Sequence, residues 1–235
     1  DRPIPGLYAA GELVGGLYFG EKEVGVNARG LRYVKETLEY DEEQIARIMH
    51  EALQLSMRRK KVLHNIHKSN VLKSSVLWNE VLEEVAVEYP EVEIKHILVD
   101  AAATLLCLNP GQFDVMVMEN MFGDILSDQG GGILGSLGLM PSACKGPEKS
   151  YYEPSPGSAP DIAGKNIANP YALIMSGQML FEWLGRKRGE DKATQAAKLI
   201  DTAVDKVIAE ARHLTADLGG KATTTHMGDA VAAAV

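Results

Sequence analysis

Two aspartates four residues apart, Asp124 and Asp128, are the side chains of this chain best suited to chemistry. On a helix, side chains at this spacing lie on one face, with β-carbons ~5–6 Å apart. Two like charges repel at that separation, and a divalent cation bound by carboxylate oxygens would turn the repulsion into attraction. The alternative is a solvated acidic helix face, the usual setting for charges. The neighbouring residues are apolar and argue against a simple outside face: Met121, Phe122, Ile125 and Leu126.

Two further charged side chains stand where predicted strands end. Lys68 follows the run at 62–66, and Asp100 follows the run at 92–99. A third run leads directly into the acidic stretch described above. Taken singly, Lys68 fits a surface lysine and Asp100 fits a helix N-cap. Because ligands bind beyond the carboxyl ends of the strands in open α/β sheets, one amine and three carboxylates at such ends predict a shared site.

Strand-like and helical patterns alternate in the part of the chain that holds these residues. Asp41 is a favourable N-cap for the first helix, whose apolar residues repeat at helical spacing. The predicted strands lie at 62–66, 92–99 and 113–118, and the predicted helices at 42–60, from Ser74 or Ser75 to Pro90, and at 101–108. Alternating strands and helices with short links indicate an α/β fold with a mostly parallel sheet and helices on both faces.

An arm is predicted near residues 15–35, ahead of the first helix. A strand is expected to run into Gly15 and Gly16, followed by an antiparallel hairpin around 21–29. A two-stranded ribbon is only marginally stable alone and usually needs a partner. The arm therefore predicts a dimer.

The chain changes character after the three glycines at 130–132. Residues 141–160 are rich in proline and glycine and are too long for a simple connector, which predicts a functional loop. Helices are expected at 169–185 and 191–211, and a short last helix is capped within Thr223 to Thr225. No strand is expected after 140, so these helices lack an obvious sheet to lie on. We therefore divide the chain into domains at 1–134 and 135–235.

Composition narrows the classes of function. The 235 residues carry a formal net charge of −8 and no basic stripe that could neutralise phosphates, which argues against a nucleic-acid partner. No apolar run approaches the ~18 residues of a membrane span, and no signal-peptide pattern opens the chain. Cys107 and Cys144 are widely spaced and form no zinc or disulfide pattern. A cytoplasmic protein without membrane contact is expected.

Five segments carry a family resemblance. They are Gly-Gly-Leu-Tyr-Phe-Gly (15–20), His-Lys-Ser-Asn-Val (67–71), Val-Asp (99–100), Glu-Asn-Met-Phe-Gly-Asp-Ile-Leu-Ser-Asp (119–128) and Gly-Ser-Ala-Pro-Asp-Ile-Ala-Gly-Lys-Asn-Ile-Ala-Asn-Pro (157–170). From about Gly15 onward, the chain resembles the NAD-dependent β-decarboxylating dehydrogenases of the isopropylmalate/isocitrate dehydrogenase family. That resemblance implies the family's fold, with a first domain for substrate, metal and dimerisation. The second domain is then part of a nucleotide-binding domain whose N-terminal strands are absent here.

The resemblance assigns roles to the charged residues. Asp124 and Asp128 would bind Mg²⁺ or Mn²⁺ together with Asp100 of a neighbouring subunit, which makes a homodimer with shared active sites. Lys68, also from the neighbouring subunit, would take the proton of the substrate hydroxyl. Tyr18 would donate a proton to the carbon that loses CO₂. Taken alone, Tyr18 fits a packed aromatic residue with a satisfied hydroxyl.

The resemblance also places the cofactor. Asp161 would bind the ribose hydroxyls and repel a 2′-phosphate, which favours NAD over NADP. Asn70 would face the nicotinamide, and Val71 would line the pocket for a substrate alkyl group. The remaining residues expected to hold the adenosine half of NAD are Gly157, Ser158, Ala159, Pro160, Ile162 and Asn169.

The implied reaction is the oxidative decarboxylation of a 2-hydroxy dicarboxylic acid, with 3-isopropylmalate, giving 2-oxoisocaproate, as the favoured substrate. Tartrate or D-malate, isocitrate and homoisocitrate are alternative substrates. A different class of function is a truncated, non-catalytic, dimeric metal-binding module.

Three features depart from the family pattern. Gly11 stands where the family has an arginine, and Ala101 stands where an asparagine commonly follows the aspartate. Residues 3–12 resemble a flavin-binding segment of fumarate-reductase-like flavoproteins. Because no other flavoprotein motif accompanies them, we interpret this second similarity as local.

Overall fold

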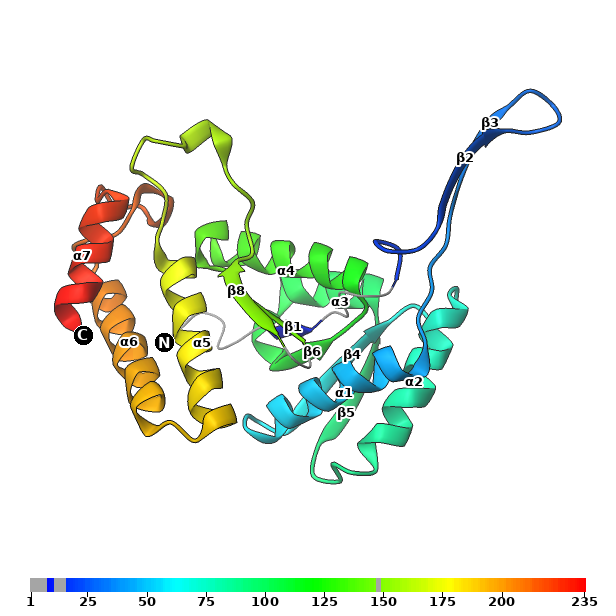
Figure 1. The fold of residues 1–235 in the computed structure, drawn as a ribbon, viewed down its shortest axis with the longest axis horizontal. Coiled ribbons are helices and arrows are strands. Elements are labelled where there is room, and N and C mark those ends of the chain that lie inside the picture. The colour runs from blue at the N-terminus through cyan, green and yellow to red at the C-terminus, as the bar shows by residue number, and fades with distance from the viewer. Residues whose placement is uncertain (1–7, 11–15, 147–148) are drawn as a thin grey trace. The chain divides into compact units, whose positions relative to one another are not determined.

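The computed structural model describes residues 8–10, 16–146 and 149–235 (Figure 1). The chain divides into two compact units, Asp1–Gly130 and Gly131–Val235. Gly11 and most of the flavoprotein-like segment 3–12 lie outside the described residues.

The first unit is built on a parallel sheet. In the described residues the strand order is β1-β6-β4-β5, and every neighbouring pair is parallel. The strands are β1 (Tyr8–Ala10), β4 (Val62–His67), β5 (Glu93–Leu98) and β6 (Val115–Val117). All of β6 and all but the first residue of β4 are buried, as expected for strands covered on both faces. The predicted α/β class with a parallel sheet is confirmed. The flavoprotein-like segment contributes β1 to this sheet.

The helices of this unit lie on both sides of the sheet (Figure 1). They are α1 (Glu42–Met57), α2 (Lys73–Ala86), α3 (Val99–Leu108) and α4 (Asn120–Leu134), with a short 3-10 turn at Pro110–Gln112. The main core joins α1 and α2 to β4 and β6, and its fully buried residues include Ile45, Met49, Leu53, Leu63, Leu82 and Val115. The carboxyl ends of β4, β5 and β6 lead into the segments that carry the predicted site.

Two predicted helix starts can be compared with the structure. Asp41 caps α1 as predicted, because its side chain accepts the N–H of Gln44 while the Gln44 side chain accepts the N–H of Asp41. The predicted cap of α2 at Ser74 or Ser75 is wrong. The helix begins at Lys73 after Leu72, without a side-chain cap. Ser75 is buried instead, and its hydroxyl accepts the backbone N–H of Lys68 at 3.1 Å.

Asp100 is not the N-cap of its helix. It lies in the first turn of α3, whose N-cap is Leu98. A carboxylate in the first turn of a helix still interacts favourably with the helix dipole. The alternative interpretation of Asp100 as a simple cap is therefore wrong.

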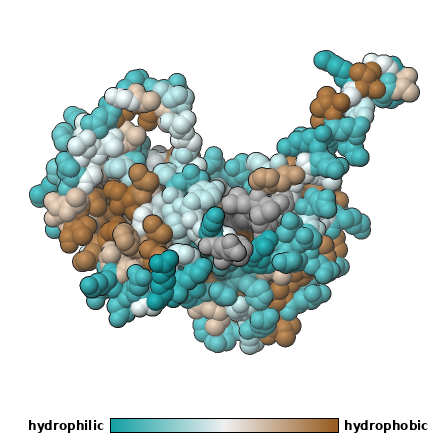
Figure 2. Space-filling view, viewed as in Figure 1, coloured by the Kyte–Doolittle hydropathy of each residue, from teal (hydrophilic) through white to brown (hydrophobic). Residues whose placement is uncertain are grey.

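The predicted arm is a two-stranded antiparallel ribbon. Its strands are β2 (Lys22–Val26) and β3 (Arg32–Glu36), and Gly16–Gly20 form a turn before it rather than the predicted strand at Gly16. The ribbon carries four apolar side chains that are 54–77% exposed: Val24, Val26, Leu31 and Val34. Figure 2 shows hydrophobic residues on the surface of this ribbon. Exposed apolar side chains on a ribbon with free edges favour contact with another chain.

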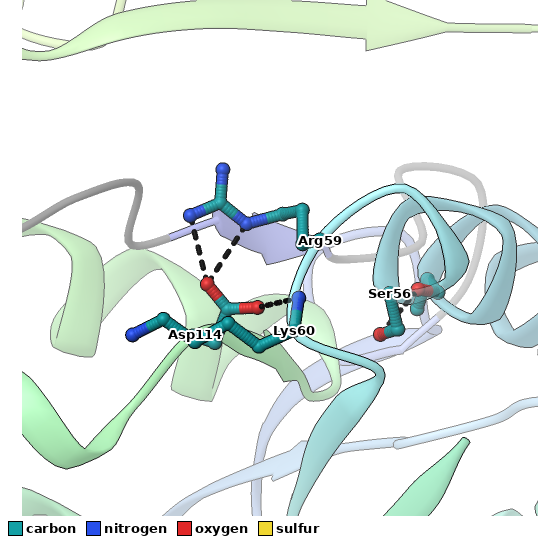
Figure 3. Close-up of polar contacts among 5 residues, drawn as sticks. Ser56, Arg59, Lys60 and Asp114 are labelled. Atoms are coloured by element: carbon teal, nitrogen blue, oxygen red, sulfur yellow. Dashed lines mark hydrogen bonds and ion pairs between the residues drawn. The ribbon is translucent and has the colours of Figure 1, made fainter. Parts of the chain in front are cut away.

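An ion pair between Arg59 and the buried carboxylate of Asp114 lies at the amino end of the sheet (Figure 3). Asp114, directly before β6, is 2% exposed and accepts hydrogen bonds from Nε and Nη2 of Arg59 at 2.9 and 2.8 Å. Its other oxygen accepts the N–H of Lys60 at 3.1 Å. The end of α1 is therefore tied to the start of β6, at the opposite end of the sheet from Lys68.

An Asp114→Asn substitution should lower the free energy of unfolding by about 1.5–3 kcal/mol, because hydrogen bonds to a buried charged group would be weakened. Urea unfolding at neutral pH measures this change. Glu91→Gln is a control, because it removes the partner of Lys61 in an exposed ion pair, where we expect less than about 1 kcal/mol. Equal effects of the two substitutions would contradict a structural role for Asp114.

The second unit joins a β-ribbon to helices. The ribbon consists of β7 (Pro141–Lys145) and β8 (Ser150–Pro154), which are antiparallel. The helices are α5 (Tyr171–Arg188), α6 (Asp191–Glu210) and α7 (Thr224–Ala234), with 3-10 turns at Leu137–Leu139, Pro160–Ile162 and Ala216–Leu218. The predicted cap of the last helix is confirmed, since Thr223 accepts the N–H of His226.

The prediction of no strand after residue 140 is wrong. Pro141 pairs with Pro154, and these prolines indicated a loop although proline is tolerated at the ends and edges of strands. The ribbon is held on α5 by Ser176, which is fully buried. Its hydroxyl accepts the N–H of Ser142 and lies 2.9 Å from the carbonyl oxygen of Glu153. Across the described ranges, no helix has the length and apolar character needed to cross a membrane.

Candidate active site

Tyr18 and Asp124 form the first pair of the predicted site. Tyr18 lies in the turn between Gly16 and Gly20, at the base of the arm, and its side chain is 47% exposed. Its hydroxyl donates a hydrogen bond of 2.9 Å to Oδ2 of Asp124, in the second turn of α4. The resemblance gave the two residues separate roles, and the structure brings them into contact.

This contact changes the acid–base behaviour of Tyr18. The hydrogen bond to Asp124 raises the pKa of the Tyr18 phenol above its usual value, and desolvation and the charges of Asp124 and Glu119 act in the same direction. A raised phenol pKa means that the hydroxyl keeps its proton to higher pH. Tyr18 is therefore held in the form that can donate a proton.

Asp128 lies one helical turn beyond Asp124, and both side chains are exposed. Ile125 between them is 57% exposed, so within a single chain this is an outside face, contrary to the sequence-based expectation. Among the described residues, no group of three His, Cys, Asp or Glu side chains is placed to hold a metal ion. The described part of one chain thus supplies two neighbouring carboxylates on α4 but not a complete ligand set.

Lys68 and Asp100 form the second pair. Lys68 follows β4, Asp100 follows β5, and these neighbouring parallel strands end in register at His67 and Leu98. The Nζ of Lys68 lies 2.8 Å from Oδ1 of Asp100, and the exposed fractions of the two side chains are 24% and 66%. The hydrogen bond from Lys68 lowers the pKa of the Asp100 carboxyl below its usual value. Asp100 therefore stays ionised at a lower pH than an ordinary aspartate.

The predicted cofactor residues lie in two places. Asn70 and Val71 follow Lys68 in the turn before α2, and both are exposed, Val71 at 68%. The other predicted residues lie on a largely exposed stretch of the second unit that contains the 3-10 turn Pro160–Ile162, with Asp161 at its centre. Gly157, Ser158, Ala159 and Asp161 are exposed. The carboxylate of Asp161 is therefore accessible to a ligand.

Asn169 differs from the rest of this group because its side chain is engaged within the chain. Its Oδ1 accepts the N–H of Tyr171 at 2.9 Å, and its Nδ2 donates to Oδ2 of Asp217 at 2.9 Å. Asp217 also accepts hydrogen bonds from Ser136 and Thr215. Asp217 was not predicted from the sequence, because Asn169 and Ser136, the partners that connect it to the rest of the unit, lie 48 and 81 residues away.

Comparison with known proteins identifies the family. The model of the family "Isocitrate/isopropylmalate dehydrogenase" matches residues 7–231. The chain belongs to this family. The resemblance stated from the motifs is thereby confirmed.

Relatives in this family include two proteins named 3-isopropylmalate dehydrogenase. The one from Hydrogenovibrio crunogenus is 46% identical over 230 residues, which are 95% of this chain and 62% of the relative. The one from Bacillus cereus is 49% identical over 223 residues, which are 94% of this chain and 59% of the relative. The chain thus spans about three-fifths of the length of these relatives.

Solved structures of the family have the same fold. The crystal structure of isocitrate dehydrogenase from Methylococcus capsulatus matches with a TM-score of 0.87 and 35% identity, and covers 97% of this chain and 66% of that one. A β-decarboxylating dehydrogenase from Thermococcus kodakarensis, in its apo form, matches with a TM-score of 0.77 and 34% identity, and covers 92% of this chain and 60% of that one. The predicted family fold is therefore confirmed.

Proposed function

We propose that this chain carries the metal, substrate and dimerisation residues of an NAD-dependent β-decarboxylating dehydrogenase, together with part of its nucleotide-binding domain. The proposed domains are 1–134 and 135–235. The reaction is the oxidative decarboxylation of a 2-hydroxy dicarboxylic acid, and 3-isopropylmalate is the favoured substrate because relatives named for it share nearly half of their aligned residues with this chain. The observation that carries the proposal is the presence of two acid–base pairs, Tyr18–Asp124 and Lys68–Asp100.

The active unit that we propose is a homodimer. Each chain carries both pairs, but no described part of one chain gathers three carboxylates around a cation. If Lys68 and Asp100 of each copy meet Tyr18, Asp124 and Asp128 of the other, the dimer interface completes two sites. The exposed apolar arm supports association of two copies, since a ribbon of this kind gains stability from a partner.

The donor set suits the implied metal. Asp124, Asp128 and Asp100 offer carboxylate oxygens, which Mg²⁺ and Mn²⁺ favour, and no thiol or imidazole that would select zinc or copper. When bound, the metal would stabilise negative charge on the substrate oxygen, and NAD would accept the hydride. The proton transfers would be carried out by two side chains of the protein, Lys68 and Tyr18.

In the proposed mechanism, Lys68 acts as the neutral amine: its Nζ takes the proton of the substrate hydroxyl, the carbon that bears the hydroxyl gives up a hydride, for which NAD would be the acceptor, and that carbon becomes a ketone. The bond to the β-carboxylate then breaks and CO₂ leaves, with its electron pair remaining on the substrate as an enolate. Tyr18 gives its phenolic proton to the carbon that lost CO₂. Asp100 keeps a negative charge beside Lys68, and Asp124 holds the Tyr18 hydroxyl in place.

We propose that exposed residues of the second unit bind the adenosine half of NAD. The Asp161 carboxylate would bind the ribose hydroxyls and disfavour a 2′-phosphate. Gly157, Ser158, Ala159, Pro160 and Ile162 would line the adenosine side, while Asn169 would mainly anchor the end of the loop through Asp217. Asn70 would contact the nicotinamide, and Val71 the substrate. The cytoplasmic location expected from the sequence stays a prediction.

The purified chain should form NADH from 3-isopropylmalate in the presence of Mn²⁺, with less product from malate, tartrate or isocitrate and with NAD preferred to NADP. Absorbance at the NADH band measures the rate. A chain that forms no NADH from any of these acids would contradict the enzyme proposal. Tartrate or D-malate, isocitrate and homoisocitrate remain the alternative substrates, and the rates rank them.

A second candidate is a dimeric metal-binding module without catalysis. The observation that favours it is that the chain spans only about three-fifths of the relatives' length. Such a module should elute as a dimer in gel filtration and bind Mn²⁺ in a calorimetric titration without binding NAD. Measurable NAD affinity would exclude it in favour of the enzyme.

A further inference from the structure

Tyr40, which has no role in the function proposed above, touches both segments that carry the Tyr18–Asp124 pair. It lies two residues before α1 and is 9% exposed. Its hydroxyl donates to Oε2 of Glu119 at 3.2 Å and accepts the backbone N–H of Asn120, also at 3.2 Å. Asn120 is the first residue of α4, so Tyr40 holds the start of the helix that carries Asp124.

Glu119 completes this attachment. Its carboxylate is 6% exposed and accepts the N–H groups of Met121 and Phe122, each at 3.1 Å. It therefore satisfies the free donors at the start of α4, where a negative charge is also favoured by the helix dipole. The direction in which α4 leaves the sheet, and with it the position of Asp124, depends on Glu119 and Tyr40.

The turn that carries Tyr18 rests on the same tyrosine. A β-carbon added at Gly16 would lie 2.2 Å from the Tyr40 hydroxyl oxygen, and Gly16 has a φ of +76°, so a side chain is excluded there. The N–H of Gly16 donates to the carbonyl oxygen of Glu39 at 2.7 Å. At the other end of the turn, a β-carbon on Gly20 would lie 1.7 Å from the carbonyl oxygen of Thr37. The Tyr18 turn is thus seated directly on the segment that ends in Tyr40.

We propose that Tyr40 is a positioning residue: its hydroxyl, bonded to Glu119 and Asn120, locks the start of α4 to the Tyr18 turn so that the Tyr18 hydroxyl meets Asp124. Its catalytic consequence rests on the function proposed above, whereas the positioning itself does not. The hydroxyl bonds the start of α4, and the Tyr18 turn packs against the same hydroxyl at Gly16, so its loss should free the start of α4 from the turn.

The ring of Tyr40 is held independently of the hydroxyl. It packs edge-on against Trp78, with ring centroids 6.0 Å apart. Trp78 is in turn fixed by a hydrogen bond of 2.8 Å from its Nε1 to Oδ1 of Asn65 in β4. A Tyr40→Phe substitution therefore removes the bonds to α4 while keeping the ring beside Gly16.

The test observes Tyr18 directly in the chain labelled with ¹³Cζ-tyrosine. The Tyr18 signal is assigned as the one that disappears in the Tyr18→Phe variant. The Asp124→Ala variant gives the chemical shift of Tyr18 without its hydrogen bond to the Asp124 carboxylate. We expect Tyr40→Phe to move the Tyr18 signal toward its Asp124→Ala position. Tyr89→Phe is the matched control: it removes a hydroxyl that contacts His50 elsewhere in the same unit and should leave the Tyr18 signal in place.

An unmoved Tyr18 signal in a folded Tyr40→Phe chain would overturn the proposal. If Tyr40→Phe does not fold, Glu119→Gln takes its place, because it removes the negative charge to which the Tyr40 hydroxyl donates. It should move the Tyr18 signal in the same direction, and an unmoved signal in Glu119→Gln would also overturn the proposal.

In the active enzyme, Tyr40→Phe should lower kcat about ten- to a hundredfold, the cost of misplacing a reacting group, and leave the KM for NAD unchanged. A fall in kcat without movement of the Tyr18 signal would contradict positioning. If the parent chain lacks dehydrogenase activity, the proposed function fails, and the Tyr18 signal still decides the role of Tyr40.

Discussion

Lys68→Met and Asp124→Asn variants should each lose nearly all dehydrogenase activity, and a mixture of the two should recover about a quarter of the parent activity. Loss of a general acid or base typically costs about 10²–10⁴ in rate. The recovery follows from the proposed dimer, in which each site takes Lys68 from one copy and Asp124 from the other. The measurement is NADH formation after the two variants are mixed, unfolded and refolded together.

The size of the recovery is fixed by symmetry. In a mixed dimer, one site combines both substitutions and the other combines both native residues, so one site of the two is intact. Random pairing makes about half of the dimers mixed, and half of half gives about a quarter.

A second mixture is the matched control. Lys68→Met and Asp100→Asn affect the same pair, so every site in their mixed dimer lacks one of the two residues and no activity should return. Recovery in both mixtures, or in neither, would be incompatible with sites shared between two copies.

The framework of the site was predictable because its signals are local. The strand β6 is recognisable as an apolar run, β4 as a short run of mixed residues between two helical patterns, and α1 by the Asp41 cap and its apolar residues at helical spacing. Charged residues at the ends of such strands could be placed at one edge of the sheet from topology alone. Lys68 and Asp100 do meet there, because β4 and β5 are neighbours in register.

The contacts that the sequence did not predict depend on residues far apart in the chain. Tyr18 and Asp124 are 106 positions apart, and Tyr40 and Glu119 are 79 apart, so no helical or strand period relates them. The sequence predicts a helix cap at Ser74 or Ser75 because serine favours that position, but the Ser75 hydroxyl accepts the backbone N–H of Lys68 instead.

The ribbon of β7 and β8 was missed for another reason. Its two strands pair with each other and lie on α5, where Ser176 contacts both strands and the Trp183 ring lies 6.5 Å from the Tyr152 ring. Proline at both ends then gave the segment the composition of a loop. Propensity describes a residue's average setting, and here the tertiary contact with Ser176 overrides it.

Asp124→Asn should weaken the binding of Mn²⁺ by at least about a hundredfold, beyond the 10–100-fold that loss of a mere supporting partner costs. The reason is that the substitution removes a charged oxygen ligand, and the affinity of such sites follows the number of charged ligands. Asp128→Asn should have a comparable effect. Isothermal titration with Mn²⁺ measures both and needs neither substrate nor NAD.

The Asp100→Asn variant distinguishes a metal site shared between two copies from a metal site formed within one chain. If Asp100 of a second copy completes the ligand set, this substitution should weaken Mn²⁺ binding although Asp100 contacts Lys68 and not Asp124 within its own chain. Glu84→Gln, which changes an exposed carboxylate of α2 in the same unit, is the control and should leave the affinity unchanged. If Asp124→Asn binds Mn²⁺ as tightly as the parent chain, Asp124 is not a metal ligand. If only Asp100→Asn binds Mn²⁺ as tightly as the parent chain, Asp100 is not a ligand and a second copy is not needed to complete the metal site. Because the dehydrogenase and the non-catalytic module share this metal site, the titration tests the carboxylates independently of whether the chain catalyses the reaction.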